Sequence, residues 1–198
     1  MLIKSSSLLN LPILSVHMGG KIAEVSEIII NPDNLKVEAF RLIGPEVGGE
    51  NGDILQTKDI REFSMGLGAI VDSADEFVND ADVIKLQKIL EIDFKLIDKS
   101  VETKKGSKLG KVSSYMVNSD DFMVQQLIVR RPLLKSFIDP ELVIGRSEVV
   151  KVTDDKIIIK DEESKIRKKA MTEDFVPNFV NPFREPNLST ADTKNLDE

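Results

Sequence analysis

The chain has 198 residues, of which 41% are apolar and 31% charged, a composition typical of a globular protein of one or two domains and not of a disordered or membrane protein. It contains no cysteine, which excludes disulfides, thiolate metal sites and thiol nucleophiles. The net charge of −7 argues against a general nucleic-acid coat, because binding to phosphate backbones needs clustered Lys and Arg.

The N-terminal stretch places apolar residues after Lys4, as a signal peptide would. We expect none, because Asn10 and Pro12 interrupt the run and no small-residue cleavage site follows. No segment approaches the roughly 18 consecutive apolar residues that a membrane-spanning helix needs. The sequence therefore predicts a soluble, cytoplasmic protein without a membrane span.

Residues 19–44 are restated without a gap at residues 106–131. Seven positions are identical at an offset of 87, namely Gly19/Gly106, Lys21/Lys108, Val25/Val112, Ser26/Ser113, Asn31/Asn118, Asp33/Asp120 and Val37/Val124. The match resumes at an offset of 89, where residues 53–63 correspond to 142–152. The chain is thus one β module written twice.

Each copy predicts a short strand, a hairpin turn with a glycine in positive φ (Gly19, Gly106), and a second strand over 22–30 or 109–117. That strand ends in an Asn and Asp turn, and an apolar third strand follows. A final hairpin is expected over 60–72 in the first copy and over 148–161 in the second.

The third strand carries a slip in its alternation. Its apolar residues are Leu35, Val37, Phe40 and Leu42, and in the second copy Phe122, Val124, Leu127 and Val129. The spacing of two, three and two predicts a β-bulge near residues 38–40 and another near 125–127, which would bend the strand as a small barrel requires.

Between the copies, apolar residues at 83, 86, 89 and 90 predict a helix that Asp80 or Asp82 caps and that packs between the two copies. The predicted division is a first domain over 1–75, a helical linker over 76–97, a second domain over 98–162 and a charged, partly disordered tail over 163–198.

This order of turns and strands resembles the PRC-barrel family over about residues 8–72 and 98–161. Members of this family include the H subunit of photosynthetic reaction centres and the C-terminal domain of the ribosome maturation factor RimM. The resemblance implies two small, strongly bent antiparallel β-barrels used as adaptors, with no catalytic residues to carry over.

The sequence contains no recognisable motif for a catalytic, metal or phosphate-binding site. His17 is the only histidine, and neither a metal-ligand cluster, a phosphate-binding glycine loop nor a serine triad is present in the sequence. We therefore expect no catalytic residue, no metal and no cofactor.

Two segments remain as candidate interaction surfaces. Six basic residues of the second copy would form a positive patch if its strands bring them together: Lys104, Lys105, Lys108, Lys111, Arg130 and Arg131. Solubilising lysines at a hairpin tip are the alternative. In the tail, Phe175, Phe179 and Phe183 would dock either on the protein's own barrels or on a partner.

The sequence favours a non-enzymatic adaptor that binds protein partners through tandem PRC-barrel-like domains. One alternative is an RNA- or ribosome-associated maturation factor related to RimM. A second is a small-molecule sensor or hydrolase that uses a cleft between the barrels, which would require convergent polar groups in that cleft.

Overall fold

The computed structural model describes residues 1–48, 52–64, 66–79, 81, 83–132 and 140–161. These residues form two sheets, each of seven strands. The first sheet contains β2 Pro12–Ser15, β3 Gly20–Asn31, β4 Lys36–Ile43, β5 Ile54–Gln56, β6 Glu62–Ser64, β7 Gly68–Val71 and β8 Phe77–Val78. The second contains β1 Leu2–Lys4, β9 Ser100–Thr103, β10 Lys108–Asn118, β11 Val124–Arg130, β12 Glu141–Gly145, β13 Val149–Val152 and β14 Lys156–Ile159.

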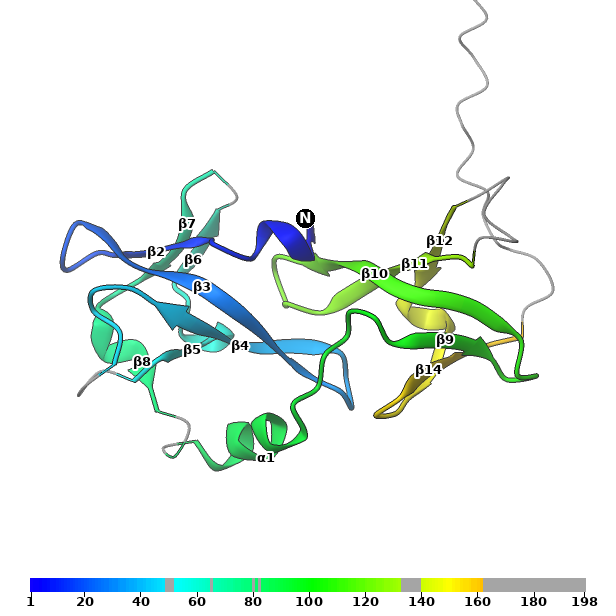
Figure 1. The fold of residues 1–198 in the computed structure, drawn as a ribbon. Coiled ribbons are helices and arrows are strands. Elements are labelled where there is room, and N and C mark those ends of the chain that lie inside the picture. Colours follow the sequence, from blue (N-terminus) through cyan, green and yellow to red (C-terminus); the bar gives the residue numbers. More distant parts are fainter. Residues whose placement is uncertain (49–51, 65, 80, 82, 133–139, 162–198) are drawn as a thin grey trace, which may run out of the picture. The chain divides into compact units, whose positions relative to one another are not determined.

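Both copies have the same strand order (Figure 1). The first sheet runs β6-β7-β2-β3-β4-β5-β8, and the second runs β13-β14-β9-β10-β11-β12 with β1 paired to β10. The first strand of each copy pairs in parallel with the last, as Ile13 with Ala69 and Val101 with Ile157. The mainly β prediction is confirmed, and the described strands of the two copies follow one another in the same order. The strand path stays open in each sheet, because no described pairing joins β5 to β6 or β12 to β13.

Besides the strands, the described residues contain several short helices. They are the 3₁₀ turns η1 Ser5–Ser7, η2 Thr57–Asp59, η3 Ala74–Glu76 and η6 Arg146–Glu148, and the α-helix α1 Ile84–Ile92. Val83 holds the N-cap position of α1 without a side-chain cap. The predicted capping residues, Asp80 and Asp82, lie outside the described residues. The apolar face of α1 packs on Ile29 and Ile54 of the first sheet, and not between the copies as expected.

The predicted bulges are confirmed in both third strands. The register of β3 against β4 shifts between Ile29/Ala39 and Ile30/Val37, which leaves Glu38 as the extra residue. The register of β10 against β11 shifts in the same way and leaves Gln125 as the extra residue. Because an extra residue bends and twists its strand, both sheets curve at the same place.

A second bulge lies on each central strand, at the identical residues Ser26 and Ser113. The Ser26 hydroxyl donates to the Arg41 carbonyl at 3.1 Å, and the Ser113 hydroxyl donates to the Ile128 carbonyl at the same distance. A serine side chain at this position thus provides a hydrogen bond to the neighbouring strand where the ladder is interrupted.

The two copies pair with each other through matching residues. The Val37 amide donates to the Phe122 carbonyl at 2.9 Å, and the Val124 amide donates to the Leu35 carbonyl at 2.9 Å. Leu35 and Phe122 both have positive φ, 55° and 56°, directly after their Asx turns. A reciprocal contact between equivalent residues is the arrangement of a twofold dimer interface, here within one chain.

Apolar packing continues across this junction into one core. The Phe122 ring lies edge-on to Phe40 at 6.0 Å and to Phe63 at 5.6 Å between ring centroids. Strand β1 adds a further link, since Ile3 pairs with Val117 and the Ser5 and Ser114 hydroxyls hydrogen-bond at 3.2 Å. No local pattern in residues 2–4 indicates that they belong to the second sheet.

We predict that Phe122→Ala lowers the free energy of unfolding by about 3–5 kcal/mol, because its buried ring joins the two copies. The melting temperature should then fall by about 10 °C, measured by calorimetry. The exposed Lys105→Ala is the control and should melt as the wild type does. A Phe122→Ala protein that melts like this control would contradict the shared core.

The turn between β6 and β7 offers a matched pair of glycines. A Cβ on Gly68, which has φ +120°, would lie 2.1 Å from the Pro12 carbonyl oxygen, whereas a Cβ on Gly66 would meet nothing within 4 Å. We predict that Gly68→Ala destabilises the fold by on the order of 2 kcal/mol or more, and that Gly66→Ala changes stability by less than about 0.5 kcal/mol. Chemical denaturation of both variants measures the difference, and equal midpoints would refute the β2–β7 pairing.

Candidate functional site

The predicted basic patch divides into two groups. Lys104 and Lys105 lie in the exposed turn between β9 and β10, and Lys108 begins β10 opposite Glu102. Lys111 lies about 10 Å further along the same strand, given a rise of about 3.3 Å per residue, and directly opposite Arg130.

Acidic groups accompany both parts of this patch. The Glu102 carboxylate accepts from Lys156 Nζ at 2.8 Å, and the Asp161 carboxylate accepts from the Lys105 amide at 3.0 Å. In the strand register, Arg130 of β11 lies opposite Glu141 of β12 as well as Lys111 of β10. The three residues therefore form one exposed row across the sheet. Arg131 is half-buried, and its amide donates to the Pro140 carbonyl. The surface is therefore mixed in charge.

Glu102 of β9 and Lys156 of β14 form an ion pair, and each changes the pKa of the other. The hydrogen bond from Lys156 lowers the pKa of Glu102, and the same bond raises the pKa of Lys156. Burial raises the pKa of the Tyr115 phenol on β10, so this tyrosine stays neutral.

The tail motif, Phe175, Phe179 and Phe183, lies outside the described residues. His17, the only histidine, is exposed, and its amide donates to the Asp72 carbonyl at 3.0 Å. Within the described part of the chain, no three His, Asp or Glu side chains gather closely enough to hold a metal ion.

A groove of about 370 Å³, the outer groove, lies between the N-terminal segment and strands β10 and β11. Its apolar lining includes Leu9, Ile28, Ile97 and Ile128, and Lys4 and Glu141 lie at its margin. Val143, which is 45% exposed, is paired with Ile128 and therefore extends the apolar lining across β12. Sequence reasoning missed this groove, because its walls come from two distant parts of the chain, residues 4–28 and 97–141.

The matching face of the first copy has an ion-paired arginine and a covering helix in place of exposed apolar side chains. Arg41 occupies the position of Ile128 and forms ion pairs with Asp53 and, at 3.7 Å, with Glu27. Ile54 occupies the position of Val143 and is fully buried beneath α1. One module thus covers this face with charges and a helix, while the other presents exposed apolar side chains.

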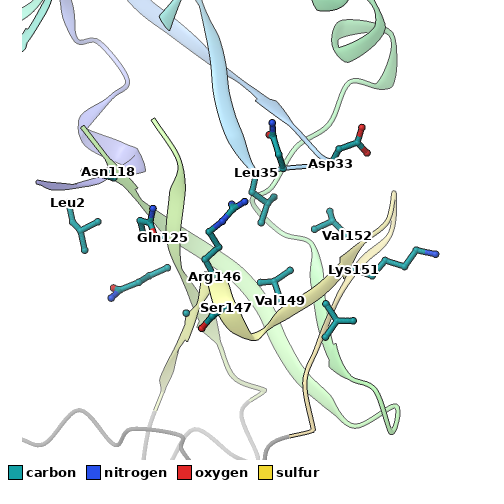
Figure 2. Close-up of a pocket in the computed structure, with 14 residues that line it drawn as sticks. Leu2, Asp33, Leu35, Asn118, Gln125, Arg146, Ser147, Val149, Lys151 and Val152 are labelled. Atoms are coloured by element: carbon teal, nitrogen blue, oxygen red, sulfur yellow. The ribbon is translucent and has the colours of Figure 1, made fainter. Parts of the chain in front are cut away.

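A second cavity, the junction pocket, has a volume of about 890 Å³ and lies where the two copies meet (Figure 2). Its lining comes from the turn at Asp33–Leu35, from β1, from β11 and from the segment 145–152. Arg146 stands in the middle of the pocket in Figure 2, between Gln125 and Leu35, while Lys151 points away from it. The Arg146 Nη1 atom is buried and has no hydrogen-bond partner among the described residues.

Comparison with known proteins adds no relative: no protein-family model matches the chain, and no curated protein matches it. The described helices are all too short to cross a membrane, since α1, with 9 residues, is the longest.

We predict that Glu102 titrates below the usual range of a glutamate and that Lys156→Gln raises its pKa, because the variant removes the hydrogen bond that favours the charged carboxylate. A folded-state pKa below the unfolded value means that the carboxylate stabilises the fold above that unfolded value. The contribution is lost as the pH falls through the lowered pKa. Carboxyl-carbon NMR titration measures the midpoint. The control is Lys58→Gln, which changes an exposed lysine of η2 in the first copy. An unchanged midpoint in Lys156→Gln would contradict the pairing.

Proposed function

We propose that this chain is a cytoplasmic, non-enzymatic adaptor built from two PRC-barrel-like modules, and that its outer groove binds a segment of another protein carrying apolar and acidic side chains. The observation that carries the proposal is the exposed apolar lining of the outer groove next to the basic residues Lys111 and Arg130. The identical strand order of the copies and their matching bulges support the PRC-barrel-like reading, because bulges of this kind bend the strands of small barrels.

Apolar side chains provide the first half of the complementarity. Ile128 and Val143 lie side by side on neighbouring strands, and Leu9 and Ile97, which are 43% and 40% exposed, face the same groove. A contiguous exposed apolar surface with a polar rim is typical of a protein-interaction site.

Charge provides the second half. Lys111 and Arg130 form the row next to Ile128, and Lys4 lies on the margin of the groove. These three cations outnumber Glu141, the acidic residue of the same margin. A partner segment with apolar residues and one or two carboxylates therefore matches the groove better than an uncharged or basic segment would.

RNA is the competing partner for the same basic residues. Affinity for RNA would depend on Lys and Arg and would fall steeply with salt, whereas the apolar side chains of the groove would contribute little. Glu141 lies opposite Arg130 in this row and opposes a phosphate backbone. Glu102 and Asp161 do the same beside Lys108 and Lys105. The geometry therefore favours the protein partner.

The test selects peptides from a displayed random library on the full chain and measures the enriched peptides by calorimetry. We expect enrichment of sequences that combine apolar and acidic residues, and a loss of affinity of about tenfold or more in Val143→Asp and in the double variant Lys111→Glu/Arg130→Glu. Leu67→Asp, an exposed apolar position on the β6–β7 turn, is the matched control and should bind as the wild type does.

A single-stranded uridylate oligonucleotide is the second probe. Binding of this RNA that the double charge variant abolishes and Val143→Asp leaves intact, together with peptides that ignore Val143→Asp, would overturn the adaptor proposal in favour of RNA binding.

A further inference from the structure

The duplication creates two equivalent positions for a pocket at the junction of the copies. One is the junction pocket, where the turn at Asp33–Leu35 faces the segment 145–152. The other lies where the matching turn, 120–122, faces the matching segment, 57–63. The strand registers fix the correspondence: Gln56 pairs with Ala39 as Gly145 pairs with Gln126, so the next residues, Thr57 and Arg146, are equivalent.

Aromatic side chains occupy the second position. Phe63 pairs with Ala69 as Val152 pairs with Ile157, so Phe63 corresponds to Val152. The Phe63 and Phe122 rings pack edge-on at 5.6 Å and leave a cavity of only about 300 Å³. In the junction pocket the equivalent side chains are Val152 and Leu35, and the cavity is about 890 Å³. Smaller side chains have opened one of two equivalent pockets.

The polar group inside each pocket differs as well. The Thr57 hydroxyl donates toward the carbonyl oxygens of Val37 and Glu38, at 3.0 and 3.2 Å, and so its hydrogen-bonding capacity is used within the protein. Arg146 instead places its guanidinium in the junction pocket. Its Nη1 atom is covered by surrounding atoms and has no hydrogen-bond partner among the described residues. A buried, unpaired donor on a cation is costly unless an acceptor reaches it.

We propose that the junction pocket binds a small organic carboxylate, with Arg146 holding the carboxylate and Leu35, Val149 and Val152 contacting its apolar portion. This ligand site is separate from the outer groove and extends the protein's function beyond the adaptor role. The volume lies within the range of small-molecule pockets. Asp33 is the one acidic residue of the lining, and it is exposed, so the electrostatic balance inside the pocket favours an anion.

A carboxylate suits this site because a guanidinium presents parallel N–H donors that match its two oxygens. Side chains around Arg146 add further donors and no second buried cation: Gln125 lies beside it, while Lys151 points away. Leu35, Val149 and Val152 lie on the other side of Arg146 from Gln125, so a ligand with a charged head and a short hydrocarbon chain fills both parts of the pocket.

The test uses the full chain and two probes of the same shape, hexanoate and its neutral counterpart hexanamide. Methyl NMR titration follows Leu35, Val149 and Val152. We expect saturable shifts with hexanoate, binding of hexanamide weaker by about tenfold or more, and a similar loss for hexanoate in Arg146→Gln, because both changes remove the charge-assisted hydrogen bonds. Val152→Phe, which restores the side chain of the filled pocket, should abolish the shifts of Leu35 and Val149.

Lys105→Gln is the control, because Lys105 lies in the exposed turn between β9 and β10, outside the lining of the junction pocket, and the variant should leave hexanoate binding unchanged. The absence of saturable shifts at these methyl groups, equal affinities for the two probes, or unchanged affinity in Arg146→Gln would each overturn the proposal. Peptide binding at the outer groove should persist in Val152→Phe, so a failure here is distinguishable from a failure of the adaptor proposal.

Discussion

Backbone pairing between residues 35–37 and 122–124 is the constraint on which the rest of the structure depends. Each copy ends its Asx turn with a residue in positive φ, Leu35 or Phe122, whose carbonyl accepts a hydrogen bond from an amide of the other copy. The two resulting hydrogen bonds are equivalent, so neither module can rotate without breaking both. The same turns place Phe122 in the shared core and Leu35 at the wall of the junction pocket.

Divergence between the copies then determines which surfaces remain available. In the first copy α1 covers the outer face of the sheet, Arg41 is paired with carboxylates, and Phe63 fills the pocket at the junction. In the second copy the matching positions hold Ile128, Val143 and Val152, which leave a groove and a pocket. A duplicated module permits this division, because one copy can provide packing while the other loses bulk at the same positions.

Sequence reasoning succeeded where a local pattern reflects a local cause. The spacing of apolar residues located the bulges at Glu38 and Gln125, because side chains must return to the core after an extra residue. The identity of Ser26 and Ser113 was visible, yet its reason, a hydroxyl bond across each second bulge, required the strand register. Alternation also says nothing about whether the two edge strands of a curved sheet meet, so the closed barrel expected from the bulges and the resemblance stays a prediction.

The candidate sites depend on long-range pairings that no local pattern encodes. Pairing of β1 with β10 joins residues more than 100 positions apart, and it forms a wall of the outer groove. The basic residues were evident from the sequence, but the positions of Glu102, Glu141 and Asp161 among them were not. The equivalence of Arg146 and Thr57 emerges only from the strand registers, across a loop that is two residues longer in the second copy.

Amide hydrogen exchange at Val37 and Val124, followed by NMR on the full chain, tests the reciprocal junction most directly. The amides of Val25 and Val112 are the reference, because each donates within its own copy, to Leu11 and Lys99. The account predicts that Val37 and Val124 exchange as slowly as these two and as slowly as each other, since both bonds break in the same opening event. Fast exchange at Val37 and Val124 beside slow exchange at Val25 and Val112 would show that the modules fold without pairing, and would contradict the account.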